Sequence, residues 1–266
     1  MSYQLDTHLP SRQFHLNSKH ARNIGVSQYV WDLSETLSLD AKYNFLVSVV
    51  SAQIPFSMYT INDSNKVFLV NGVEYSIPVG NYNVLELIRE VANAVGILTL
   101  EYNQITNKVR VASDTAFSIR NSGSHEPFLR LLGFKLDLYE DQTEYVSDSV
   151  VNLSGISSIH LISNLGTQNF DSFSKKGSHV LARLPVNTVS NGIIFWENLF
   201  HHRSLISQTT ISEIAIELLD SQFFPVDLNG VDFSITLQLD VIKKPSVKQV
   251  LNITKPPIKK ISKPKV

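Results

Sequence analysis

The chain contains no cysteine and none of the common catalytic motifs. Without cysteine it can form no disulfide, no thiolate metal site and no cysteine nucleophile. The glycine-rich phosphate loops, the Gly-x-Ser-x-Gly nucleophile elbow and the His-Glu-x-x-His metal motif are also missing. No apolar run is long enough to span a bilayer, and the first residues lack the apolar core of a secretory signal. The sequence therefore predicts a soluble, non-enzymatic protein without a cofactor or a bound metal.

The charges are distributed unevenly along the chain. The 266 residues include 23 basic and 24 acidic side chains. The last 24 residues hold no acid but eight of the lysines, namely Lys243, Lys244, Lys248, Lys255, Lys259, Lys260, Lys263 and Lys265. The rest of the chain therefore has 15 basic against 24 acidic residues, a net charge of −9. We interpret this tail as an arm that docks on a partner, which would be an acidic protein surface, a nucleic-acid backbone or an anionic membrane. A solubilising terminus is the alternative.

Alternating apolar and polar residues predict antiparallel strands at both ends of the sequence. From Val231 to Asp240 the alternation is unbroken, and similar patterns occur in residues 179–186 and 211–220. Residues 43–56 are apolar on both faces, which is typical of a central strand covered on both sides. No helical segment separates the later strands, so an antiparallel sandwich is favoured over a parallel sheet.

Residues 62–143 have a different pattern. Asn71-Gly72 predicts a tight hairpin turn, because both residues tolerate positive φ. Apolar residues at helical spacing follow Asn83, which with Glu86 can form a capping box, and Gly96 can end the helix. A second strand pair and a short helix follow, so this segment is predicted to be a small α+β unit.

Two predicted strands precede this unit and five or six follow it, which gives about eight strands. The sequence thus predicts an all-β protein with an inserted α+β subdomain, in which about eight antiparallel strands form a single jelly-roll β-sandwich. The predicted parts are an N-terminal arm (1–24), a jelly roll (25–61 plus 144–242), an insertion (62–143) and a basic tail (243–266).

The remaining polar residues are assigned to surfaces rather than to chemistry. His201 and His202 are interpreted as exposed loop residues, and His160 as a histidine on the outer face of a strand. Asp232 and Asp240 are placed on the solvent-facing side of the last strand. No pair of carboxylates stands out as the acid and base of a hydrolase.

Three segments of the sequence resemble a known family. They are "IPVGNYNVLELI", "LLGF" and "DLNGVDFSITLQL", in the order expected for a jelly roll with an early insertion. In this respect the chain is similar to the penton, or minor capsid, proteins of virophages, polinton-like elements and related large eukaryotic DNA viruses, in the adenovirus-type capsid lineage. The resemblance implies a structural virion protein, made in the host cytoplasm, that forms homopentamers at the five-fold vertices of an icosahedral capsid.

The resemblance also implies partners: further copies of the chain, the major capsid protein and other minor capsid proteins. The insertion would project outward, and the tail would allow contact with genome or membrane. It supplies no catalytic residues.

Two alternatives remain open from the residues. A carbohydrate- or receptor-binding sandwich on a viral surface would expose aromatic residues such as Tyr75, Tyr82 and Tyr102. A cupin-like enzyme would need histidines and a carboxylate inside the sandwich, and the predicted strands lack them.

Overall fold

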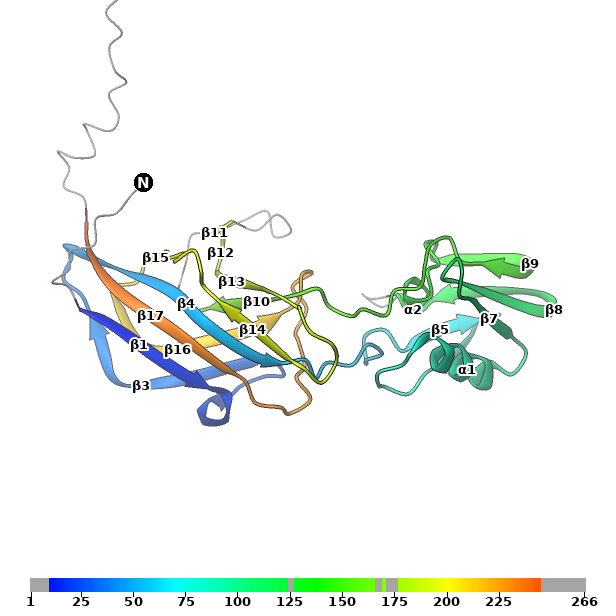
Figure 1. Cartoon of the computed structure of the whole chain (residues 1–266), viewed down its shortest axis with the longest axis horizontal. Helices are drawn as coiled ribbons and strands as arrows, with labels where there is room; N and C mark the ends of the chain where they lie inside the picture. Colours follow the sequence, from blue (N-terminus) through cyan, green and yellow to red (C-terminus); the bar gives the residue numbers. More distant parts are fainter. Residues whose placement is uncertain (1–9, 124–126, 166–168, 171–176, 245–266) are drawn as a thin grey trace, which may run out of the picture. The chain divides into compact units, whose positions relative to one another are not determined.

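A computed structural model describes residues 10–123, 127–165, 169–170 and 177–244. The chain forms two compact units (Figure 1). The first comprises the described residues up to Phe56 together with those from Ser158 onward, and the second comprises residues 57–157.

The first unit consists of two antiparallel sheets. In sheet A the strands have the order β1-β17-β4-β14, and β15 also pairs with β4. Their bounds are β1 (Ser11–Asn17), β17 (Ser234–Lys243), β4 (Tyr43–Pro55), β14 (Ile193–Glu197) and β15 (Ser204–Ile206). Sheet B consists, in spatial order, of β13 (Val180–Pro185), β10 (Ser158–Ser163), β16 (Thr210–Leu219), β3 (Gln28–Ser38) and β2 (Arg22–Asn23). The short helix η1 (Ser18–His20) joins β1 to β2, and β11 (Asn169–Phe170) pairs with β12 (Gly177–Ser178).

The order of these strands is that of a single jelly roll. In chain order β1, β4, β14 and β17 belong to sheet A, whereas β3, β10, β13 and β16 belong to sheet B. The first and last strands of the series lie side by side in sheet A, with Ser11 opposite Asp240. Two sheets joined in this way form the jelly-roll sandwich that the sequence predicts, with the second unit inserted between β4 and β10.

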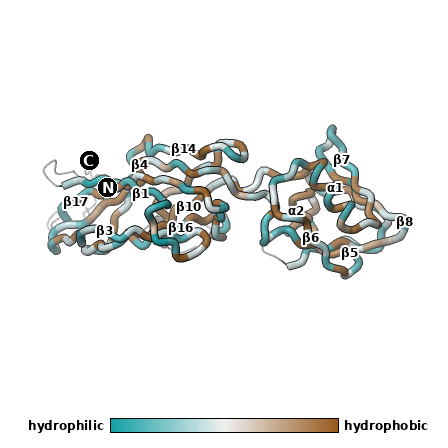
Figure 2. The backbone as a smooth tube through the Cα atoms, turned by 90° about the horizontal axis from the view of Figure 1, so that it is seen from below, coloured by the Kyte–Doolittle hydropathy of each residue, from teal (hydrophilic) through white to brown (hydrophobic). Residues whose placement is uncertain are grey.

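The core of the jelly roll lies between the sheets. Ile54 of β4, Leu237 of β17 and Ile214 of β16 are completely buried, while polar neighbours in the same strands face outward. Figure 2 shows the resulting alternation of hydrophobic and hydrophilic residues along the strands. The rings of Tyr29 and Phe233 meet edge to face at 4.7 Å and close one end of this core. Each fully buried leucine, isoleucine or phenylalanine side chain of this core stabilises the fold by about 1.5–3 kcal/mol.

The beginning of the chain differs from the predicted N-terminal arm. Ser11–Asn17 forms β1 at the edge of sheet A, and Arg22–Asn23 forms β2 at the edge of sheet B. The Ser18 hydroxyl donates to Asp232 at 2.7 Å and accepts the backbone N–H of Phe233 at 3.0 Å. These bonds fix the turn after β1, so residues 11–23 are part of the sandwich.

The second unit is a sheet with two helices. The strands have the order β6-β5-β8-β7, with β9 on the other side of β8. They are β5 (Val67–Val70), β6 (Val73–Ser76), β7 (Thr99–Asn103), β8 (Lys108–Asn121) and β9 (Leu138–Val146), and the helices are α1 (Val84–Val95) and α2 (Phe128–Leu131).

Local signals in the sequence determine two features of this unit. Asn71 and Gly72 both have positive φ, 51° and 78°, in the turn between β5 and β6. At the start of α1, Asn83 accepts the N–H of Glu86 while the Glu86 carboxylate accepts the N–H of Asn83, and Gly96 ends the helix in a left-handed conformation. The predicted hairpin and helix are therefore confirmed.

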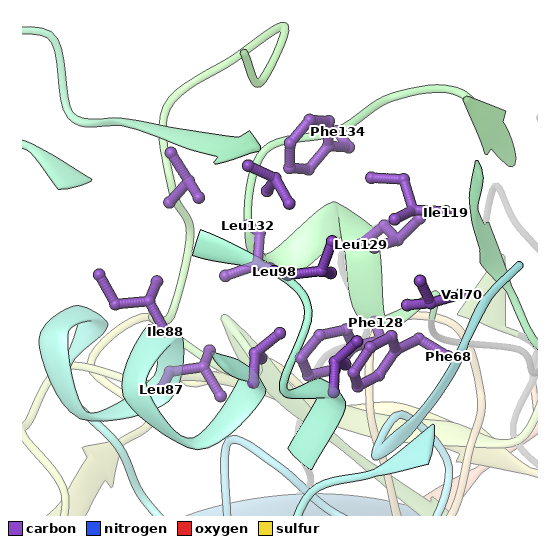
Figure 3. Close-up of a cluster of buried hydrophobic side chains, with 14 of the residues drawn as sticks. Phe68, Val70, Leu87, Ile88, Leu98, Ile119, Phe128, Leu129, Leu132 and Phe134 are labelled. Carbon is purple, nitrogen blue, oxygen red and sulfur yellow. The ribbon is translucent and has the colours of Figure 1, made fainter. Parts of the chain in front are cut away.

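The second unit has its own apolar core (Figure 3). Phe68 and Phe128 stack at 4.7 Å in it. Ile61 and Tyr145 are also buried in this core, and Leu153 packs against it. The unit therefore extends over residues 57–157, beyond both ends of the predicted 62–143.

Candidate interaction site

Strand β14 lies at an open edge of sheet A, opposite the edge formed by β1. Among the strands of the described residues it pairs only with β4. Ile194 points into the core and is fully buried, whereas Ile193 and Phe195 on either side of it are 62% and 48% exposed. An open strand edge with exposed apolar side chains is a site where another protein can bind.

The loop of residues 198–203 interrupts this edge between β14 and β15. It carries Leu199, 74% exposed, and Phe200, 93% exposed. Val189, which lies before β14, is exposed as well. These five residues form what we call the edge patch: Val189, Ile193, Phe195, Leu199 and Phe200. Several exposed apolar residues along one edge strand and its flanking loops, unlike single ones, favour an interaction surface.

Hydrogen bonds hold the 198–203 loop in a defined conformation. The side-chain amide of Asn198 donates to the carbonyl of His202 at 2.8 Å, and its oxygen accepts the N–H of His202 at 2.9 Å. The N–H of His201 donates to the carbonyl of Asn198 at 3.2 Å, and His201 has a positive φ of 50°. The loop therefore already has a fixed conformation in which Leu199 and Phe200 are exposed, and it need not become ordered when a partner binds.

The arginine that ends this loop is anchored to sheet A. Arg203 lies with Nε 3.4 Å from the Asp240 carboxylate of β17. Asp240 also accepts hydrogen bonds from Ser11 at 2.6 Å and Gln238 at 2.9 Å, and it is buried. The prediction that Asp240 faces solvent is therefore wrong, because β1 and the 198–203 loop cover that part of β17.

The predicted histidines occupy different environments. His201 and His202 are exposed, as predicted. His160 of β10 is instead buried, with its ring edge to face at 5.3 Å from Phe223 in the loop after β16. Within the described ranges no group of three or more possible metal ligands comes together. No helix found there is long and apolar enough to cross a membrane.

Only the first two tail lysines lie in the described part of the chain. Lys243 ends β17 opposite Tyr43, and the N–H of Lys244 donates to the carbonyl of Lys42 at 2.8 Å. Both side chains are exposed. The other six, Lys248, Lys255, Lys259, Lys260, Lys263 and Lys265, lie outside the described residues.

The three tyrosines considered for glycan binding pack against the core of the second unit. Tyr75 stacks on Phe68, with ring centroids 6.1 Å apart. The Tyr82 hydroxyl donates to the carbonyl of Pro78, and that of Tyr102 donates to the side chain of Asn107. These contacts tie the three tyrosines to the core and the turns of the second unit.

Strand β9 is an open edge of the second unit, and it is acidic. Glu140, Asp141 and Glu144 are exposed on it, beside a shallow hollow of about 590 Å³. Charged residues on an edge strand discourage pairing with other strands. Arg110 lies 3.2 Å from Glu101 and 2.7 Å from Glu144, and its hydrogen bond lowers the pKa of Glu144.

A second polar network follows β9. The Tyr139 hydroxyl donates to the carboxylate of Asp148, which also accepts the N–H of Lys135 at 2.8 Å. These two hydrogen bonds lower the pKa of Asp148 below its ordinary value of 3.8, and the bond from Tyr139 has the larger effect. Burial is the main cause that raises the pKa of Tyr139, and the hydrogen bond to Asp148 raises it further.

The fold and the edge patch together define a single jelly-roll protein with an inserted α+β unit and an exposed apolar edge. Among solved structures the chain is similar to the crystal structure of the mavirus penton protein, with 12% sequence identity and a TM-score of 0.47, over 88% of this chain and 100% of that one. No family model matches the sequence. No curated protein matches it either.

Proposed function

We propose that this protein is a structural subunit of an icosahedral virus capsid, a penton protein whose copies form homopentamers at the five-fold vertices. The proposal begins from the resemblance of three sequence segments to penton proteins. Its main support in the structure is the edge patch, because exposed apolar side chains along an open strand favour contacts between protein subunits.

The two ends of strand β4 also suit a protein embedded in a shell. Its last residue, Pro55, leads into the inserted unit, whereas its first residue, Tyr43, lies beside Lys243, after which the lysine-rich tail begins. Thirteen residues of extended strand separate these ends by about 40 Å. The residues from which the chain continues into the insertion and into the tail therefore lie at opposite ends of β4, as expected if one faces outward and the other inward.

The proposal includes the partners and the location of the protein. Copies of the chain contact one another and the surrounding major capsid protein, with other minor capsid proteins as further neighbours. The protein is made in the host cytoplasm and functions in the virion. The eight lysines of residues 243–266 would contact an acidic partner surface, the genome or an anionic membrane from inside the shell.

Labelling of intact particles tests this function. An antibody raised against residues 57–157 is expected to bind the particle vertices in electron micrographs, because the inserted unit faces outward. An antibody against the peptide of residues 251–266 serves as the control and is expected to bind only after the particles are opened. Label spread evenly over the faces, or absent from purified particles, would contradict the proposal.

A further inference from the structure

The outer face of sheet B carries a groove of about 290 Å³, lined by apolar residues together with the polar residues Gln28, Ser163 and Asn164. Its lining includes Val30 of β3, Ile162 of β10 and Ala215 of β16. Ile24, 56% exposed, and Glu217 also line it. The outer face of a sandwich sheet normally carries polar side chains, so a hollow here that contains several apolar residues is suited to an apolar side chain from another molecule.

The small side chain of Ala215 helps to form this groove. Ala215 lies directly opposite Val30 in the register between β16 and β3, and Glu217 lies opposite both Gln28 and Ile162. Because Ala215 has only a methyl group, its strand position leaves room between larger neighbours.

We infer that Leu199 and Phe200 of one copy of the chain bind in the sheet B groove of the next copy. This inference rests on the proposed function, since it specifies how the copies of a ring contact each other. The two surfaces belong to the same jelly-roll unit, so every copy carries both a projecting loop and a groove. A ring needs just such a pair of different, complementary surfaces.

The position of the two surfaces favours a ring over a symmetric dimer. The 198–203 loop interrupts the edge of sheet A, whereas the groove lies on the broad face of sheet B. The edge and the broad face of a sandwich point roughly at right angles, so successive copies turn around an axis. A two-fold dimer would instead bring the same patch of both copies together.

Polar groups beside the two surfaces can hydrogen-bond to each other. Glu217 accepts a hydrogen bond from Gln28 at 2.9 Å, and it takes part in none of the ion pairs found in the described part of the chain. His201 and His202 follow Phe200 directly and are both exposed, whereas Arg203 is paired with Asp240. An imidazole N–H of this loop could donate to the Glu217 carboxylate of the next copy, which would orient the contact.

The loop also has the properties of a binding hot spot. Its conformation is fixed by the bonds of Asn198, so little ordering entropy is lost on binding. Phe200 is almost fully exposed in the single chain and would become buried in the contact. Removing the ring in Phe200→Ala is therefore expected to weaken association at least about 30-fold.

The test uses two full-length variants that each lack one half of the contact. Phe200→Asp removes the apolar side chain of the loop, and Ala215→Arg fills the groove while remaining compatible with the neighbouring acids. Light scattering after size-exclusion chromatography measures the mass of each variant and of their mixture. Ile105→Asp, at an apolar residue of the second unit that is 94% exposed, is the matched control.

We expect the wild type and Ile105→Asp to form rings and each of the two variants alone to stay monomeric. Mixed together, they are expected to form heterodimers and nothing larger, because each pair retains one intact loop and one intact groove. If Ala215→Arg does not fold, Ile24→Asp replaces it, since Ile24 is an exposed residue of the groove.

Rings formed by both variants would overturn the loop-in-groove contact and leave the proposed function standing. Monomeric variants that fail to form heterodimers when mixed would overturn the contact as well. A wild-type chain that never self-associates would count against the proposed function itself and would remove the basis of this inference.

Discussion

Arg203 and Asp240 connect the exposed loop of the jelly roll to its last strand. The guanidinium Nε lies 3.4 Å from the Asp240 Oδ2 atom, and the carboxylate is only 5% exposed. That oxygen makes no hydrogen bond within the described structure, so the charge of Arg203 is what compensates its burial. Residues 203 and 240 thereby hold the 198–203 loop against sheet A.

Asp240→Asn is expected to lower the free energy of unfolding of the jelly roll by about 1–3 kcal/mol. The substitution keeps the shape of the side chain but removes the charge that Arg203 faces in a poorly solvated position. Urea unfolding followed by tryptophan fluorescence measures this, since both tryptophans, Trp31 and Trp196, lie in the jelly-roll unit.

Glu35→Gln is the control, because it breaks the exposed ion pair between Arg12 and Glu35. It should change the same free energy by less than about 0.5 kcal/mol. Equal effects of the two substitutions would show that the Arg203–Asp240 pair has no special importance.

The second unit is expected to lose stability in acid. A carboxylate whose pKa is lower in the folded protein than in the unfolded chain stabilises the fold above the unfolded pKa. This contribution is lost as the pH falls through the folded pKa. Asp148 is such a group, with an ordinary pKa of 3.8, and Glu144 is another. The free energy of unfolding should therefore fall as the pH is lowered from about 4 towards 2.

Tyr139→Phe tests the cause of this acid sensitivity, because the Tyr139 hydroxyl is the main reason for the lowered pKa of Asp148. The variant should be less stable at pH 7 and depend less on pH between about 5 and 2. Tyr102→Phe is the control, since it removes a bond to the amide of Asn107, which does not titrate. Identical pH slopes for wild type and Tyr139→Phe would rule out this explanation.

Gly133→Ala is expected to destabilise the second unit by at least about 2 kcal/mol. Gly133 has a φ of +91°, and an added Cβ atom would lie 2.2 Å from the backbone oxygen of Ser149. Gly96→Ala separates strain from steric clash, because Gly96 also has a positive φ but has no atom within 4 Å of such a Cβ.

Gly96→Ala should cost about 1 kcal/mol, the strain of the left-handed conformation alone. Thermal unfolding followed by far-ultraviolet circular dichroism of the full chain measures both variants. A Gly133→Ala protein that is as stable as Gly96→Ala would contradict the close approach of Ser149.

Truncation after Lys244 is expected to leave the thermal stability of the jelly roll unchanged while reducing incorporation into particles. The pairing of β17 ends at Lys243, and the last described hydrogen bond of this strand comes from the N–H of Lys244. The truncated chain keeps that sheet but loses six of the eight lysines.

A full-length chain with these six lysines changed to glutamine separates charge from length. It should be incorporated as poorly as the truncated chain if the positive charge is what the partner recognises. Normal incorporation of the truncated chain would remove the docking role of the tail.

Features set by neighbouring residues could be predicted from the sequence. The turn at Asn71-Gly72 and the capping of α1 by Asn83 and Glu86 depend on residues within four positions of each other. Strands β16 and β17 follow from the alternation of apolar and polar residues, because one face of each is buried against the other sheet.

Features that depend on distant pairing could not be predicted in this way. Strand β1 has only Phe14 and Leu16 as apolar residues, and its partner β17 is more than 200 residues away. The burial of Asp240 follows from that pairing. His160 is buried by Phe223, which lies in a loop far along the sequence.

The edge patch and the groove have no signature of their own in the sequence. Leu199 and Phe200 are apolar residues of the kind usually found in a core. They are exposed because they follow β14, which lies at an open edge of sheet A. Ala215 forms part of a groove only because of its neighbours on β3 and β10.

The mass of the assembled protein tests the central claim most directly. Native mass spectrometry of the purified full-length chain, over a range of protein concentrations and ionic strengths, counts the copies in each particle. The account predicts a ring of five copies of the 29.9-kDa chain. A chain that remains monomeric under every condition, or that forms only symmetric dimers, would contradict it.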